Sequence, residues 1–303
     1  MTDVVLSTPP IEACGDAAAR LVAEAFAPPT VEMDAPFLRW VLASETREGS
    51  AEKPFTVMGH LDGVAISFVG SPTRIFRVGD TAIPVTIPSW LAISPTAAGR
   101  GMARTTYGRL IDDIRERGLA VLTYAIEGAR SVAFIESMYL ERGFVGGILP
   151  QMPLFGAIRP PAIPAEENVW SPTQPVLTLD RTPAVHAELL RDPRGALDLG
   201  VGGAIAVTAW QKTENGRKPV LLLEHLPEPL TARSLAEAVG TALTLGASHG
   251  RQLFVPNLPE GARELGRLAG LRQLPGTMYR AWIWVPDPSH PAMQCTQTTH
   301  PIL

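Results

Sequence analysis

The sequence predicts an α/β protein made of two similar halves. Strand-like and helix-like runs alternate along the chain, and the order strand–helix–strand–helix–strand occurs twice. Each half also contains a loop that leads from a strand into a helix. A chain of 303 residues with 46% hydrophobic content is large enough to bury the cores of two such domains.

The first half begins with two helices and three strands. They are predicted as helices over 11–27 and 37–42 and strands over 55–59, 64–70 and 85–93. Pro28 and Pro29 stop the first helix, and Asp62-Gly63 supplies the turn between the first two strands. Pro88 has no N–H to donate, so the third strand is expected to carry a bulge or an edge position there.

Two helices, each followed by a strand, complete the first half. They are predicted as a helix over 102–117, a strand over 120–126, a helix over 131–142 and a strand over 144–154. Leu110, Ile111 and Ile114 form the apolar stripe of the first of these helices. Gly118 and Gly143 stand where the two helices end, because glycine readily takes the left-handed conformation that closes a helix.

A proline-rich segment separates the halves. The elements predicted after it are strands over 204–210 and 219–225, a helix over 235–245, a strand over 253–256, a helix over 260–268 and a strand over 276–285. We therefore expect a domain at 1–157, a linker at 158–174, a second domain at 175–288 and a C-terminal tail at 289–303.

Charge and composition argue against several classes of function. A net charge of −4 gives no bulk attraction to nucleic acid or to an anionic membrane. No apolar run of membrane-spanning length occurs, and the N-terminus lacks the pattern of a signal peptide. Cys14 and Cys295 lie at opposite ends, and the six histidines form no ligand pattern, so no metal is expected. We expect a cytoplasmic protein with the Ala-, Arg-, Gly- and Pro-rich composition of a high-GC bacterial gene.

The most informative segment reads Leu91-Ala-Ile-Ser-Pro-Thr-Ala-Ala-Gly-Arg-Gly-Met-Ala103. It predicts a strand, a glycine turn with free backbone amides, and the N-terminus of a helix. Such amides and the positive end of the helix dipole converge on one point, an arrangement that binds pyrophosphate. Gly99 and Gly101 permit close approach, and Arg100 adds a charge-assisted contact. Strand–helix loops with glycine are also common where no ligand binds.

A second segment, Tyr139-Leu-Glu-Arg-Gly-Phe144, follows at a plausible distance. With it, roughly residues 50 to 155 resemble the GCN5-related N-acetyltransferase (GNAT) superfamily. That family has a strand ending in V-x-P, a loop Q/R-x-x-G-x-G/A, a helix, and a later Y-x-x-x-G-F segment. Ile93-Ser-Pro95 matches the strand end, and Gly101 with Ala103 matches the last two loop positions.

The resemblance implies two GNAT-like domains of the tandem type, each with a mixed, mostly antiparallel central sheet flanked by helices. It also implies that an acyl-coenzyme A lies with its pyrophosphate on the loop and its pantetheine along the strand edge. The residues expected to bind it are Leu91, Ile93, Ala98, Gly99, Arg100, Gly101, Met102, Ala103 and Arg104. Ala98 departs from the family's Gln or Arg, for which Arg100 and Arg104 could compensate, and Val132 stands near the family's Asn.

Two residues are candidates for catalysis. Tyr139 stands at the position of the general acid that, in the resemblance, protonates the leaving thiolate. A helix tyrosine that only packs is the alternative. Glu127, at the end of the strand over 120–126, is the candidate general base, because the preceding strand carries no carboxylate. A solvated loop carboxylate is the alternative for Glu127.

The corresponding loop of the second half, 226–234, has no glycine and two prolines. Proline donates no N–H, and Glu228 would repel phosphate. We therefore expect the second half to be degenerate and not to bind coenzyme A in the usual way.

The resemblance as a whole implies transfer of an acetyl or other short acyl group from coenzyme A to the amine of a small molecule. Acetyl-CoA, or another acyl-CoA, is the expected cosubstrate. Neither nucleic acid nor a membrane is an expected partner, and the sequence is compatible with a homodimer. Two alternatives stay open: a non-catalytic coenzyme A or metabolite-binding protein, and a GNAT-fold enzyme that decarboxylates or hydrolyses an acyl thioester.

Overall fold

The computed structural model describes residues 4–43, 47–126, 129–247 and 252–299. The first half consists of β1 Val5–Ser7, α1 Ile11–Ala25, β2 Thr30–Val31, α2 Ala35–Val41, β3 Phe55–Leu61, β4 Val64–Ser71, β5 Thr73–Val78, β6 Thr81–Thr86, β7 Ser89–Ile93, α3 Met102–Glu116, β8 Ala120–Ile126, α4 Arg130–Leu140 and β9 Val145–Ala157. The second half consists of β10 Val176–Leu179, α5 Pro183–Leu189, β11 Ala196–Asp198, β12 Ile205–Thr213, β13 Gly216–His225, α6 Ala232–Leu245, β14 Leu253–Val255, α7 Arg263–Leu268, β15 Arg272–Val285 and β16 Gln297–Thr298.

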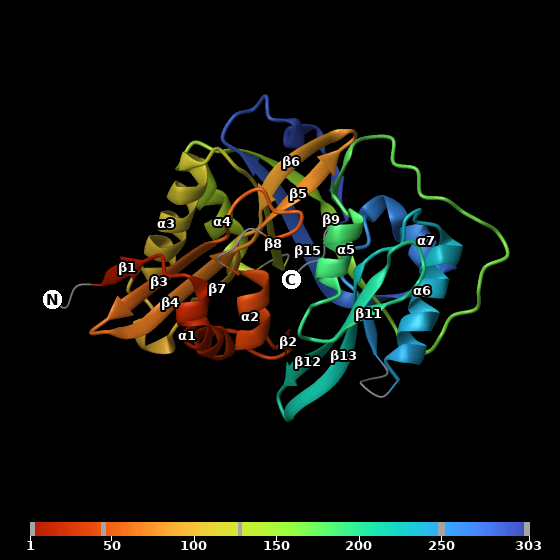
Figure 1. Cartoon of the computed structure of the whole chain (residues 1–303), viewed down its shortest axis with the longest axis horizontal. Coiled ribbons are helices and arrows are strands. Elements are labelled where there is room, and N and C mark those ends of the chain that lie inside the picture. Colours follow the sequence, from red (N-terminus) through yellow and green to blue (C-terminus); the bar gives the residue numbers. More distant parts are fainter. Residues whose placement is uncertain (1–3, 44–46, 127–128, 248–251, 300–303) are drawn as a thin grey trace.

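These elements form two sheets with helices on their faces. The smaller sheet has the order β1-β3-β4-β7, and the larger has the order β11-β12-β13-β14-β9-β15-β8-β6-β5-β10-β16. Figure 1 shows the first half with α1–α4 on one side of the molecule and α5–α7 on the other. Within the described ranges, no helix is long and apolar enough to span a membrane.

Local sequence signals explain the first elements. The side chain of Asp34 caps α2 by accepting from the Phe37 N–H at 2.9 Å. Asp62 and Gly63 both take positive φ, 52° and 77°, as a tight turn between antiparallel strands requires. Gly118 closes α3 with a φ of 67°, as predicted.

The strand predicted over 85–93 is two strands, and this corrects the sequence-based expectation. β6 ends before Pro88, β7 begins after it, and Trp90 takes a φ of 59°. β6 pairs in parallel with β8, Val85 opposite Ala120, whereas β7 pairs with β4 in the other sheet. Because Pro88 offers no N–H to either sheet, the ladder breaks there and the two sheets separate.

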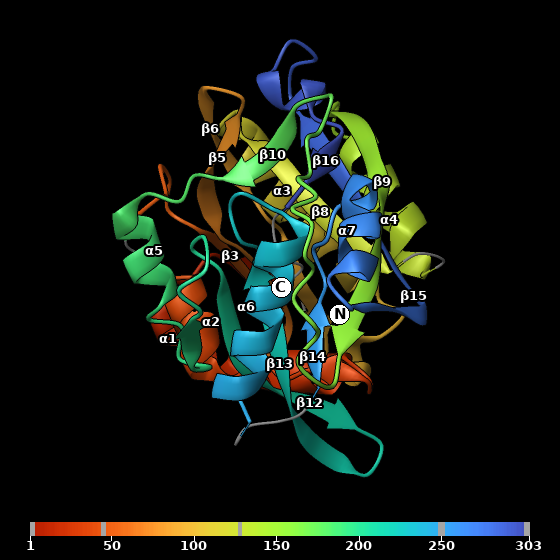
Figure 2. The ribbon, with the colours of Figure 1, turned by 90° about the vertical axis from the view of Figure 1, so that its right-hand side faces the viewer.

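The two halves share strands in the larger sheet. β15 lies between β8 and β9, so Ala281 is paired with Tyr124 on one side and Leu149 on the other. β9 in turn extends into the second half, where Phe155 pairs with Val255 of β14. Figure 2 shows β9 and β15 passing alongside β14 and α7. Each half therefore completes its sheet with a strand that belongs to the other.

Helices cover both halves of this arrangement. In α3, the predicted stripe of Leu110, Ile111 and Ile114 is completely buried against a core that includes Trp282 and Trp284 of β15. α6 and α7 bury a separate, mainly aliphatic core, α6 against β13 and β14 and α7 against α6 and β15. The second half thus contributes to the core of the first half as well as to its own.

Candidate functional site

The loop between β7 and α3 has the open geometry that the sequence predicts. Gly99 and Gly101 have φ values of 76° and 74°, the left-handed region that favours glycine. A Cβ added at either position would meet nothing within 4 Å. The backbone on this side of the loop is therefore accessible to a ligand.

The amides best placed for an anion lie at the start of α3. Gly101 is the N-cap residue, and no side chain caps this helix. First-turn N–H groups have no acceptor within a helix, which here concerns Met102 and Ala103. The N–H groups of Ala98 and Arg100 instead donate within the loop, at 3.2 and 3.3 Å. Of the amides predicted to bind the pyrophosphate, those at the helix N-terminus are therefore better placed than those earlier in the loop.

The two arginines of the loop differ in their surroundings. Arg100 is exposed. Arg104 is held by an ion pair with Glu141 at the end of α4, and the hydrogen bond that Arg104 donates to this carboxylate raises the pKa of Arg104. Both partners of this pair are largely exposed, so a phosphate could compete for Arg104 at little cost. Arg100 is thus the arginine that can compensate for Ala98 without breaking a contact.

β7 offers a free edge next to this loop. Within the described part of the chain it pairs with β4 alone and ends the smaller sheet. The Ser94 N–H donates to Ile66 of β4 at 2.8 Å. Because backbone groups alternate in direction along a strand, the N–H groups of Leu91 and Ile93 point to the opposite edge. An extended segment can add to that edge as a further strand.

Tyr139 lies in a closed aromatic core. It is completely buried, stacks on Trp284 with ring centroids 5.0 Å apart, and makes edge contacts with Tyr107 and Phe144. Its hydroxyl lies 3.2 Å from the hydroxyl of Tyr107. Burial raises the pKa of Tyr139 well above its ordinary value of 10.0, and Tyr107 adds to the shift. In this arrangement the phenol is enclosed, so its role as an acid stays a prediction.

Glu127 lies outside the described residues. Glu136 of α4 is engaged, because Oε1 accepts from the indole N–H of Trp282 at 3.0 Å. Among the described residues there is also no group of three or more His, Cys, Asp or Glu side chains that could hold a metal ion.

Solved structures of other proteins share this architecture. A tandem GNAT protein from the clavulanic acid biosynthesis pathway aligns over 95% of this chain and 100% of its own length, with 12% identity and a TM-score of 0.56. The chain has the GNAT fold. N-myristoyltransferase of Saccharomyces cerevisiae with bound myristoyl-CoA aligns over 100% of this chain and 86% of its own, with 10% identity and a TM-score of 0.62. A GCN5-related N-acetyltransferase from Sphaerobacter thermophilus aligns over 95% and 97%, with 14% identity and a TM-score of 0.52.

These likenesses concern the fold, since sequence identity is low throughout. No protein-family model and no curated protein matches the sequence. β7, α3 and β8 follow one another in the first half, and β13, α6 and β14 follow one another in the same order in the second half.

The helix N-terminus of the second half is closed. The Thr231 side chain accepts from the Ser234 N–H at 2.9 Å, and the Ser234 hydroxyl accepts from the Thr231 N–H at 3.0 Å. This capping box uses amides that α3 leaves open. The Ala232 N–H also donates to Asn168 of the linker, at 3.0 Å. The start of α6 therefore lacks the donors that a phosphate would need.

Two cavities adjoin each other, and the smaller of them lies between the halves, whereas the larger lies within residues 170–299. The larger has a volume of about 260 Å³, and its lining includes Trp170 of the linker and Glu228 of the loop before α6. The smaller has a volume of about 30 Å³. Leu179 and His225 line both. Sequence reasoning missed these cavities, because their walls come from segments distant in the chain.

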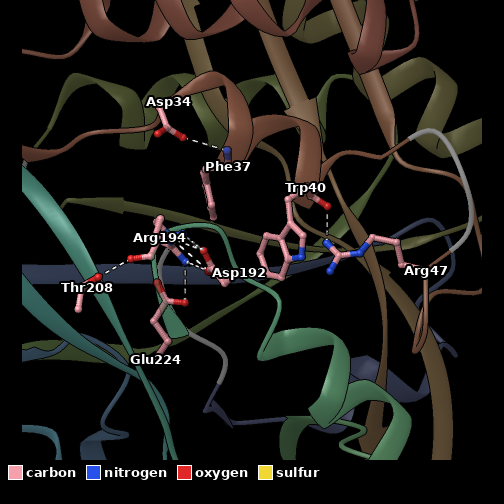
Figure 3. A network of polar contacts seen from close by, with 8 residues as sticks. All are labelled: Asp34, Phe37, Trp40, Arg47, Asp192, Arg194, Thr208 and Glu224. Carbon is pink, nitrogen blue, oxygen red and sulfur yellow. Dashed lines mark hydrogen bonds and ion pairs between the residues drawn. The ribbon is translucent and has the colours of Figure 1, made fainter. Parts of the chain in front are cut away.

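Two carboxylates that line the smaller cavity, those of Asp192 and Glu224, share a buried arginine. We call the three residues the Arg194 cluster: Asp192, Arg194 and Glu224. Arg194 donates to Asp192 at 2.6 Å and to Glu224 at 2.9 Å (Figure 3). All three side chains are nearly inaccessible to solvent. Burial alone would lower the pKa of Arg194, but the two carboxylates raise it above its ordinary value. Burial raises the pKa of Glu224 in spite of Arg194.

Proposed function

We propose that this protein transfers an acetyl or other short acyl group from an acyl-CoA to the amine of a small molecule. The observation that supports this most is the contrast between its two helix N-termini. α3 begins at an uncapped glycine in open surroundings, beside a strand with a free edge. α6 begins with a capping box. An anionic cofactor would therefore be bound once per chain, in the first half.

The residues of the first half would act on the cosubstrate as follows. Amides at Gly101, Met102 and Ala103 would bind the pyrophosphate, and Arg100 would add a charge-assisted contact. Pantetheine would add to the edge of β7 through Leu91 and Ile93. A backbone N–H near the β6–β7 break would polarise the acyl carbonyl as an oxyanion hole does.

The reaction would then proceed by direct attack. The amine nitrogen forms a C–N bond with the carbonyl carbon, and the C–S bond breaks. The leaving thiolate takes up one proton, for which Tyr139 is the predicted donor, and the amine loses one. Glu127 stays the predicted base.

Calorimetric titration with acetyl-CoA and with free coenzyme A tests the proposal. We expect one site per chain. Two sites would overturn the assignment of the second half, and the absence of binding would overturn the proposed function. A screen of amines for release of free thiol that depends on the amine would then establish transfer.

A second candidate function is a protein that binds coenzyme A without turning it over. The complete burial of the Tyr139 hydroxyl against Tyr107 favours this candidate. It predicts stoichiometric binding but no amine-dependent release of thiol. Release of thiol without any amine would instead indicate an acyl-thioester hydrolase or decarboxylase.

A further inference from the structure

We propose that the smaller cavity between the halves binds the charged head group of a zwitterionic amine, such as a free α-amino acid. The ligand's ammonium group would bind Glu224, and its carboxylate would bind Arg74. The acyl acceptor would then belong to this class of compound. That last step rests on the proposed function, whereas binding at the cavity can be measured without any turnover.

One side of the cavity presents a hydrogen-bond acceptor, a carboxylate oxygen of Glu224 that has no partner among the described residues. Glu224 is only 4% exposed, and its Oε2 accepts from Arg194 at 2.9 Å. Its Oε1 is buried and has no hydrogen-bond partner among the described residues. Leaving a buried carboxylate oxygen unpartnered is costly, so this atom favours a donor. A primary ammonium provides both the hydrogen bond and the opposite charge.

The other side of the cavity presents hydrogen-bond donors, those of the buried Arg74 guanidinium, which has no carboxylate partner among the described residues. Arg74 is 8% exposed and donates to the carbonyl oxygens of Thr73 and Val41, at 3.0 and 3.5 Å. Within the described chain, no acidic side chain lies within ion-pair distance of it. Trp40 adds an indole N–H that is buried without an acceptor. A carboxylate fits these planar donors better than a neutral group.

The balance of charge favours a ligand that carries both signs. Asp192 and Glu224 on one side are opposed by Arg194 and Arg74, so the side chains around the cavity are neutral in sum. Arg47, the other cation nearby, is already paired with Glu188. A cation alone would leave Arg74 unpaired, and an anion alone would leave Glu224 Oε1 unpaired. A zwitterion satisfies both and adds no net charge.

Size and location agree with this ligand. A volume of about 30 Å³ holds roughly two water-sized groups, so the smaller cavity would take the ammonium nitrogen and one edge of the carboxylate, and not the whole ligand. The adjoining cavity of about 260 Å³ would hold the body. Phe37 packs between the Arg194 cluster and the residue next to the β6–β7 break: the Arg194 guanidinium lies 4.0 Å from the centre of the Phe37 ring, which meets Trp90 edge-on at 5.8 Å. Figure 3 shows Phe37 beside the Arg194 cluster and Trp40 facing the same space.

The test is calorimetric titration of the full chain, without coenzyme A, using three sets of probes. These are L-amino acids, the matching amino acid amides, and the matching carboxylic acids that lack the amine. At least one amino acid should bind, and its amide and its deaminated acid should bind about tenfold more weakly or worse. If no amino acid binds, the cavity holds water only, and if the three forms bind alike, the site recognises neither charged group; either result would overturn the proposal.

Variants assign the two ends of the ligand. Glu224→Gln should abolish the preference for an amino acid over its deaminated acid, and Arg74→Gln should abolish the preference over its amide. Trp40→Phe keeps an aromatic side chain, although a smaller one, removes one donor, and should weaken binding a few-fold. The matched control is Arg77→Gln, on the same strand but in an exposed pair with Asp180, which should leave binding unchanged. Wild-type affinity in both Glu224→Gln and Arg74→Gln would contradict the proposal.

The outcome is separable from that of the proposed function. Binding of an amino acid with no binding of coenzyme A would retain this cavity and refute acyl transfer. Binding of coenzyme A without any amino acid would do the reverse.

Discussion

Two phenol groups, those of Tyr107 and Tyr139, lie 3.2 Å apart in a core from which water is excluded. Burial raises the pKa of both, so both stay protonated well beyond neutral pH. Each is the hydrogen-bond partner of the other, and either substitution to phenylalanine would break the same bond. A comparison of the two phenylalanine variants therefore distinguishes a loss of stability, which both should show, from a loss of catalysis, which only the catalytic tyrosine should show.

We expect Tyr139→Phe and Tyr107→Phe to destabilise the fold similarly, by about 1–3 kcal/mol each, because each leaves one buried hydroxyl unpartnered. Only Tyr139→Phe should lower kcat if Tyr139 is the acid, by about 10²- to 10⁴-fold. Denaturant unfolding and steady-state kinetics on both variants check this. An equal loss of kcat in the two would show that Tyr139 acts through packing alone.

His290 should make stability depend on pH. Its Nδ1 accepts from the Ala292 N–H at 3.2 Å, which requires the neutral ring. Burial lowers the pKa of His290 below its ordinary value of 6.5, against the pull of Asp287. The folded pKa lies below the unfolded one, so this contribution is complete above pH 6.5 and is lost as pH falls through the folded value.

The control for His290 is His290→Asn, which keeps an acceptor but does not titrate. Unfolding free energies measured from neutral pH to below 6.5 should fall more steeply for the wild type. Parallel curves for the two proteins would rule out this contribution.

At the scale of elements, the ends of α3 supply a matched pair of glycines. Gly101 and Gly118 have φ values of 74° and 67°, and a Cβ would meet nothing within 4 Å at either. A glutamate therefore introduces similar backbone strain and equal charge at the two ends of one helix. Only the end that carries Gly101 faces the predicted pyrophosphate site.

We expect Gly101→Glu to weaken coenzyme A binding at least about a hundredfold, because its carboxylate would repel the pyrophosphate. Gly118→Glu should bind as the wild type does, with a similar loss of stability of roughly 1–2 kcal/mol. Titration calorimetry and thermal unfolding check both. Unchanged affinity in Gly101→Glu would refute the location of the site.

Most elements could be predicted because their signals are local. The stripe of α3 and the Asp62-Gly63 turn depend on neighbours in the sequence alone, and the structure confirms both. The hairpin of β5 and β6 and the helix α5 were missed. The β6–β7 break shows the limit most clearly, because the apolar run around Pro88 resembles one strand. The partner strands, β8 for β6 and β4 for β7, decide where this run passes from one sheet to the other. The local sequence pattern does not reveal these partners.

For the whole molecule, the exchange of β9 and β15 ties the halves together. Trp282 and Trp284 of β15 are 1% and 3% exposed in the core of the first half. Removing one such side chain from a core costs about 3–5 kcal/mol. Losing both approaches the entire stability of an ordinary domain, about 5–15 kcal/mol.

A fragment of residues 1–157 should therefore not fold alone. It would leave β8 and β9 without their common neighbour and expose two unpaired strand edges. We expect aggregation, measured by size-exclusion chromatography and circular dichroism, and recovery when residues 158–303 are co-expressed as a second chain. A soluble fragment with cooperative unfolding would contradict this prediction.

The candidate site also has a part that depends on consecutive residues and a part that depends on residues distant in the sequence. The glycine loop could be found from the sequence, because its chemistry lies in consecutive backbone amides. The Arg194 cluster could not, since Glu224 lies on β13 and Asp192 follows α5, and Phe37 beneath Arg194 comes from α2. Folding of the second half brings the three charged side chains together, and assembly of the two halves adds Phe37.

The shared strands also bear on why the second half persists. After a gene duplication, a copy that loses its ligand site can usually be deleted without harm to the other. Here deletion of the second half would remove β15 from between β8 and β9. Natural selection on the predicted first site alone would therefore be enough to preserve the second half, although a capping box occupies amides at the start of α6.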